Sequence, residues 1–110
     1  MQIVKTQKIE WEDVGSNTGE KCYFRAPVYN QDINNLIKEM YENDLMDLNY
    51  IENYKLIADK DIDTLQENEI LTFLTYIIRG ERFSEGLIAI FTENGTIEKL
   101  TTRYNQLKGN

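Results

Sequence analysis

The sequence predicts a mainly α fold, a compact bundle of about four to five helices preceded by an extended or β-hairpin N-terminal flank. Two observations support this prediction. From residue 30 onward, apolar residues recur at helical spacing, whereas the first 29 residues hold two short runs of strand-forming residues around a cluster of turn formers. A length of 110 residues favours a single domain, 1–110, with residues 1–29 as the flank and residues 30–110 as the helical core.

The flank is the part of the chain for which strands are expected. The runs Lys8–Val14 and Lys21–Val28 carry β-branched and aromatic residues, and residues 15–19 between them read GSNTG. Turn formers between two such runs are typical of a hairpin. Pro27 marks the boundary with the helices, because a proline disfavours the helical conformation of the residue before it.

Two helices are predicted directly after the flank. Residues 31–41 have the spacing of an amphipathic helix, with Ile33 and Leu36 on the apolar face and Asn30 suited to the N-cap. A second, shorter helix is expected around Leu48–Ala58.

The most apolar part of the chain follows. Residues 67–93 are predicted to be helical, with an interruption near Gly80, and Asn94 and Gly95 form a helix stop. Thr96 is suited to cap a last helix. A helix that is apolar nearly all round belongs in the middle of a small domain, so we expect the others to pack around this one.

Composition excludes several classes of function. The chain has 12 basic and 19 acidic side chains, a net charge of −7, which disfavours direct binding to nucleic acid because phosphates need a positive surface. It has no histidine, so Ser-His and Cys-His nucleophile pairs and the usual zinc ligand sets are absent. We therefore expect neither a metal nor a cofactor.

Cysteine usage and hydropathy bear on location. Cys22 is the one cysteine, so an internal disulfide is excluded and a reducing compartment is the natural setting. The sequence has no apolar run of membrane-spanning length, and its N-terminus lacks the apolar core of a signal peptide. We therefore expect a cytoplasmic protein with no membrane partner.

One segment, residues 75–88 (TYIIRGERFSEGLI), combines apolar residues with four charges, Arg79, Glu81, Arg82 and Glu85. If the helical period continues through it, Phe83 extends an apolar stripe and the charges lie close to the interior. Buried charges persist only when they are paired, hydrogen-bonded or facing a polar cavity. Gly80 and Gly86 flank the charges as structural glycines that allow a backbone or a ligand to approach closely.

Two interpretations of this segment remain open. In the first, it forms a ligand-binding site made of Arg79, Glu81, Arg82, Glu85 and Tyr76, in which the arginines hold an anion and a tyrosine stacks on a ring. In the second, the same four charges form an ion-pair network that joins this helix to its neighbours. Gly80 would then end one helix, and Ser84 would cap the next.

The motif RGERFSEG resembles an uncharacterised family of small bacterial and phage proteins known as domain of unknown function 6508. The matching positions are Arg79, Glu81, Arg82, Phe83 and Gly86. Upstream, Trp11 and the run Pro27-Val28-Tyr29 are also similar to the layout of the family. The resemblance implies a shared motif and no known reaction, while a phage-encoded setting implies an anti-defence role.

We expect a non-catalytic binding module that captures either a small anionic, nucleotide-like ligand or a partner protein such as a host protein. One alternative is a small enzyme that uses the Glu81 and Glu85 carboxylates, with Arg79 and Arg82, on a phosphorylated or ribosylated substrate. A second alternative is a structural protein that forms a homodimer through tyrosine-rich faces.

Overall fold

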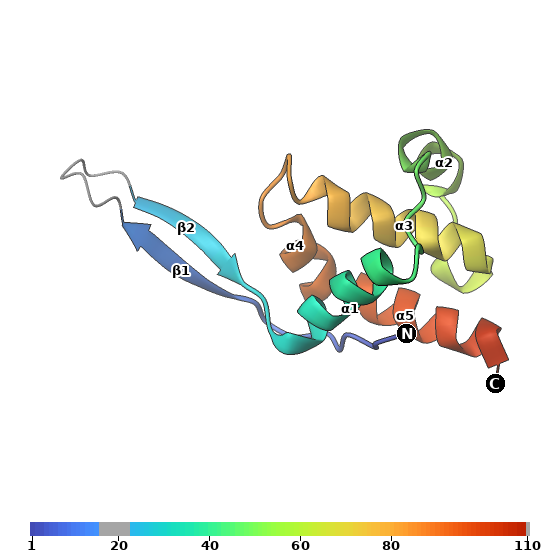
Figure 1. Cartoon of the computed structure of the whole chain (residues 1–110), viewed down its shortest axis with the longest axis horizontal. Coiled ribbons are helices and arrows are strands. Elements are labelled where there is room, and N and C mark those ends of the chain that lie inside the picture. The colour runs from blue at the N-terminus through green and yellow to red at the C-terminus, as the bar shows by residue number, and fades with distance from the viewer. Residues whose placement is uncertain (16–22, 110) are drawn as a thin grey trace.

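The structure, a computed structural model, describes residues 1–15 and 23–109 of the chain. Figure 1 shows a helical part from which a two-stranded hairpin projects. The elements in order are β1 (Glu10–Gly15), β2 (Tyr23–Val28), α1 (Gln31–Glu42), α2 (Tyr50–Ile57), the short 3-10 helix η1 (Ile62–Thr64), α3 (Glu67–Gly80), α4 (Leu87–Glu93) and α5 (Thr96–Gly109). The predicted helical fold with an N-terminal hairpin is confirmed.

The hairpin is antiparallel, and its register places Trp11 opposite Pro27 and Asp13 opposite Arg25. Its projection makes the molecule elongated, with principal extents of 53 × 27 × 26 Å. The predicted turn segment lies mostly outside the described residues, as does Cys22.

The first nine residues, which the sequence groups with the flank, pack against the helical part. Val4 and Ile9 are buried in the core. The backbone N–H of Val4 donates to Oγ1 of Thr101 on α5 (3.4 Å), and the N-terminal amine donates to Oδ1 of Asn105 (2.9 Å). The extended segment therefore fastens the base of the hairpin to the last helix.

The first two helices lie where the sequence places them. The side chain of Asn30 accepts a hydrogen bond from the backbone N–H of Ile33 (3.1 Å), which confirms Asn30 as the N-cap of α1. The second helix, α2, falls inside the predicted window.

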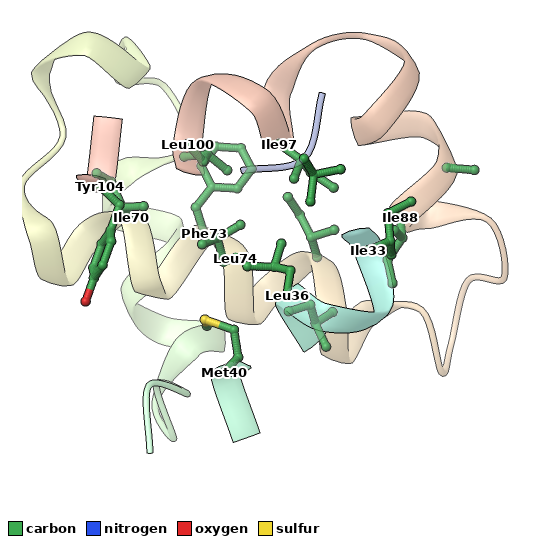
Figure 2. Close-up of a cluster of buried hydrophobic side chains, with 14 of the residues drawn as sticks. Ile33, Leu36, Met40, Ile70, Phe73, Leu74, Ile88, Ile97, Leu100 and Tyr104 are labelled. Atoms are coloured by element: carbon green, nitrogen blue, oxygen red, sulfur yellow. The ribbon is translucent and has the colours of Figure 1, made fainter. Parts of the chain in front are cut away.

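The core forms around α3, which contributes buried residues from most of its length. Figure 2 shows how side chains of α1, α4 and α5 meet those of α3 in one apolar cluster; the labelled members are Ile33, Leu36, Met40, Ile70, Phe73, Leu74, Ile88, Ile97, Leu100 and Tyr104. The central position predicted for this helix is thus observed. Among the described residues, helices that combine the length and the hydropathy required to cross a membrane are absent.

The predicted interruption near Gly80 is confirmed, because α3 ends at that residue. The residue that caps α4 is Gly86 and not Ser84. Gly86 adopts φ of +94°, a left-handed conformation in which a residue with a Cβ is strained. Residues 81–86 therefore form a tight connection, which we call the α3–α4 loop.

Candidate functional site

The α3–α4 loop contains most of the charged motif that the sequence singles out. It leaves the end of α3 and returns at once into α4, and Figure 1 shows its tip standing clear of the neighbouring helices. The backbone N–H groups of Phe83 and Ser84 both donate to the carbonyl oxygen of Gly80, at 3.0 and 2.9 Å. These bonds curl the chain immediately after the helix.

Glu81 organises this loop through both of its carboxylate oxygens. Oε2 accepts from the hydroxyl of Tyr29 and from the backbone N–H of Gly86, each at 2.8 Å. Oε1 accepts from the backbone N–H of Ile88, also at 2.8 Å. Since the first N–H groups of a helix lack partners within it, Glu81 serves α4 as the capping side chain that Gly86 cannot supply.

Tyr29 follows β2 and, among the residues that the structure describes, is the side chain that donates to Glu81. Burial raises the pKa of its phenol far above the ordinary value, and the hydrogen bond to Glu81 and the charge of that carboxylate raise it further. The hydroxyl therefore stays protonated and remains a donor to Glu81 at all ordinary pH values. It ties the end of the hairpin to the start of α4.

Gly86 is where the hairpin meets the loop. A Cβ built at this position would lie 2.6 Å from an indole carbon of Trp11 on β1, so the tryptophan ring occupies the space a side chain would need. Gly80 is also closely packed, since a Cβ there would lie 2.5 Å from Cδ2 of Leu87. Gly86 is required for both its backbone conformation and this contact.

The expectation that all four charges lie close to the interior is wrong for Arg82 and Glu85, which are exposed, while Arg79 and Glu81 are half-buried. The expected burial of Phe83 on an apolar stripe is also wrong, because this side chain is 85% exposed. Both expectations assumed that the helical period continues beyond Gly80, where the chain in fact turns.

Arg79 and Glu81 interact with different residues. Its guanidinium sits over the ring of Tyr50, 6.0 Å from the centroid, and lines a cavity of about 70 Å³ with Asp47 and neighbouring residues. Within residues 1–15 and 23–109, the ion pairs include none of the four charges of the motif. The ion-pair network interpretation therefore does not hold in this part of the chain.

Tyr76, the remaining predicted ligand-binding residue, stacks on Tyr54 of α2 with ring centroids 3.8 Å apart and planes 5° from parallel. Tyr54 also meets Phe73 edge to face at 5.2 Å. Tyr76 thus belongs to an aromatic cluster between α2 and α3, and one face of its ring is covered. The structure does not bring it into the hydrogen-bonded arrangement of Glu81.

Tyr29 and Trp11, which contact Glu81 and Gly86, were not among the site residues predicted from the sequence. Their contacts with Glu81 and Gly86 span more than 50 residues of chain, as the separation of 52 between Tyr29 and Glu81 shows. Local spacing carries no signal for such pairs. The resemblance in the upstream segment was the one signal that pointed to both positions.

Three exposed apolar side chains belong to residues in or next to the α3–α4 loop. Trp11 (37% exposed) packs on Gly86, Phe83 lies three residues before Gly86 in the chain, and Ile90 (58% exposed) donates its backbone N–H to the carbonyl oxygen of Gly86 at 3.0 Å. Arg82 and Glu85 flank Phe83 along the chain. We call these five residues the loop surface.

A groove beside the C-terminal helix lies in a different region of the molecule. This groove, of about 370 Å³, runs along α5 and is lined by Thr6, Asp63, Gly95, Glu98, Lys99, Thr102, Arg103 and Gln106. The predicted site residues are not among those that line it. Within the described ranges, carboxylate and cysteine side chains do not gather into a group that could hold a metal ion.

Comparison with known proteins gives the family and no more. The model of a family of unknown function, DUF6508, matches residues 3–110, so the chain belongs to this family. No curated protein and no solved structure matches the sequence.

Proposed function

We propose that this member of a family of unknown function is a non-catalytic binding module and that its ligand is a partner protein held at the loop surface. The observation that carries the proposal is the exposure of Phe83 on a loop fixed by Glu81. A single exposed apolar residue is ordinary on a protein surface. An exposed aromatic ring on a loop held by hydrogen bonds, with Trp11 packed on Gly86 at the end of that loop and Ile90 exposed on α4, is a better candidate for a binding surface.

The residue types of the loop surface suit a protein ligand. Aromatic residues and arginine are enriched in protein interfaces and account for much of the binding energy there. The three hydrogen bonds to Glu81 hold the loop before any partner arrives. Binding therefore costs less conformational entropy than it would for a loop that must be ordered on contact.

The anionic-ligand version of the expected function receives less support. The cavity beside Arg79 has a volume of about 70 Å³, whereas pockets for molecules of nucleotide size have volumes of about 300–1,000 Å³. Arg82 is exposed on the loop and does not share this cavity.

The enzyme alternative depends on Glu81 and Glu85 sharing one cleft. Both oxygens of Glu81 are occupied by donors of the protein itself, and Glu85 is exposed. A carboxylate held in this way has a structural task that removing a proton from a substrate would disturb.

The biological setting that accompanies our proposal is a phage-encoded chain that binds a host protein in an anti-defence role.

Selection from a random-peptide display library on the immobilised protein tests the proposal. We expect peptides selected on the wild-type protein to lose binding to the Phe83→Ser variant and to keep binding to Leu56→Ser. Leu56 is 75% exposed on α2, so the control removes a similar exposed side chain away from the loop. Peptides that bind both variants equally well, or a failure to select any, would contradict the proposal.

Light scattering on the same two variants examines the homodimer alternative. A dimer that Phe83→Ser dissociates and Leu56→Ser preserves would assign the loop surface to self-association. That result would replace a foreign partner protein with a second copy of this chain. A wild-type protein that stays monomeric at high concentration leaves the loop surface free for a partner, as proposed.

A further inference from the structure

The hairpin of β1 and β2 projects from the helical part of the molecule, and its described residues are packed against that part only at the base of the hairpin. Figure 1 shows β1 and β2 projecting from the helical part, and none of the described helices runs along their length. The packing of Trp11 on Gly86 fastens the base of the hairpin. Two strands alone are marginally stable in water, and a third strand or a packed face stabilises them. The sheet is therefore suited to receive another strand.

The two outer edges of this sheet differ in what they offer. β2 contains Pro27, which has no backbone N–H to donate to a further strand. β1 contains no proline. In an antiparallel pair, alternate residues direct their N–H and C=O groups away from the partner strand. Among residues 1–15 and 23–109, the backbone groups on the outer edge of β1 have no partner strand, so this edge presents a row of unpaired groups.

Charge determines which strand this edge favours. Glu10, Glu12 and Asp13 on β1 are all exposed. Asp13 pairs with Arg25 at 3.5 Å, whereas Glu10 and Glu12 have no ion pair within residues 1–15 and 23–109. Like charges opposite each other destabilise a strand pair, so β1 disfavours pairing with β1 of a second copy. A basic strand would place opposite charges next to these carboxylates.

We propose that the outer edge of β1 binds a basic, extended segment of a partner protein as a third, added strand. Main-chain hydrogen bonds to the unpaired backbone groups supply the attraction that does not depend on sequence. Glu10 and Glu12 select for lysine or arginine at alternate positions of the incoming strand. Trp11 belongs both to β1 and to the loop surface, but the added strand pairs with the backbone of β1 and with Glu10 and Glu12, which the loop surface does not include. The inference therefore holds whether or not Phe83 contacts a partner.

The probe is a synthetic peptide of alternating lysine and threonine, about ten residues long, which is enough to span β1. Amide hydrogen exchange, followed residue by residue by NMR, is the readout. At a saturating peptide concentration we expect exchange at alternate residues of β1 to slow by about fivefold or more, because these N–H groups gain a hydrogen-bond partner. A peptide of the same sequence with every backbone nitrogen methylated has the same charge and has neither the donors nor the space to pair with a strand, and we expect it to have no such effect.

Charge variants separate strand addition from a general affinity for cations. The double variant Glu10→Gln with Glu12→Gln should weaken binding of the Lys-Thr peptide by about three- to tenfold, as expected for the loss of two exposed charge pairs. The matched variant Glu42→Gln with Glu52→Gln, at two exposed glutamates on α1 and α2, should leave binding unchanged.

Three outcomes would overturn the inference. They are equal protection by the N-methylated peptide, protection that is not alternate along β1, and equal weakening by the two double variants. Phe83→Ser should leave the protection of β1 intact. A failure at the edge is thereby distinguishable from a failure at the loop surface.

Discussion

The helix α3 and the loop that follows it are neighbours in sequence, and they are held in place by different forces. The side chains of α3 are buried over most of its length, and the hydroxyl of the buried Thr75 donates within the helix to the carbonyl oxygen of Leu71 at 2.7 Å. The α3–α4 loop has exposed side chains, and the carboxylate of Glu81 fixes its backbone. Burial determines the position of the first, and hydrogen bonding determines that of the second.

The comparison shows how a small domain can expose an aromatic residue without losing order around it. A loop that relied on apolar contacts for its position would have to bury Phe83. Glu81 provides three hydrogen bonds that do not involve the exposed residues at all. The tip of the loop is therefore available for binding. At its base, the backbone N–H groups of Gly86 and Ile88 have hydrogen-bond partners, as the first N–H groups of a capped helix do.

The largest effect is expected in the core. Leu74 on α3 is 1% exposed, and Leu74→Ala should lower the free energy of unfolding by about 3–5 kcal/mol, because a cavity remains where the side chain was. Chemical denaturation of this variant and of Leu56→Ala, whose side chain is exposed, measures the difference. A similar small loss in both would mean that α3 is not the central element of the fold.

A change at Glu81 should be the next most damaging. Glu81→Gln replaces one carboxylate oxygen with an NH₂ group, so at least one of the three donors of Tyr29, Gly86 and Ile88 faces another donor. We expect a loss of about 2–3 kcal/mol in the free energy of unfolding. Glu85→Gln is the matched control, because Glu85 is exposed and should tolerate the change. Equal stabilities of the two variants would show that Glu81 does not organise the loop.

The spacing of apolar residues predicted the helix α3 correctly and failed in the α3–α4 loop. The spacing of apolar residues predicted the helices, and Asn30 predicted the start of α1, because both depend on residues that are close in sequence. The same spacing, extended beyond Gly80, placed Phe83 and Arg82 toward the interior. The position of the turn depends on the bonds of Glu81, and these involve a tyrosine 52 residues away.

The functional candidates show the same division. The sequence selected Glu81 and Gly86 as notable, and both are central to the loop. It grouped Tyr76 with them, although the ring of Tyr76 stacks on Tyr54 of a different helix. Which side chains of an apolar segment meet each other is decided by tertiary packing, and spacing along one helix cannot supply that information.

A smaller effect, with a characteristic pH dependence, is expected at Tyr29. Tyr29→Phe removes one donor to Glu81 and should lower the free energy of unfolding by about 1–1.5 kcal/mol near neutral pH. Because the pKa of Tyr29 is raised in the folded protein, its stabilisation is complete below the unfolded value of 10.0 and is lost as pH rises toward the folded value. The difference in stability between wild type and variant should therefore shrink above pH 10, as denaturation at several pH values would reveal. A difference that stays constant or grows in alkali would contradict the assignment.

The smallest effect on stability should be found where the effect on binding is largest. Phe83 is 85% exposed, so Phe83→Ser removes little buried area and should change the free energy of unfolding by less than about 0.5 kcal/mol. The same substitution is expected to abolish binding of peptides selected on the loop surface. Thermal melting, run beside the peptide-binding assay, checks both on one sample. A large loss of stability would mean that the ring contributes to the fold, and the contrast between a buried helix and a displayed loop would no longer hold.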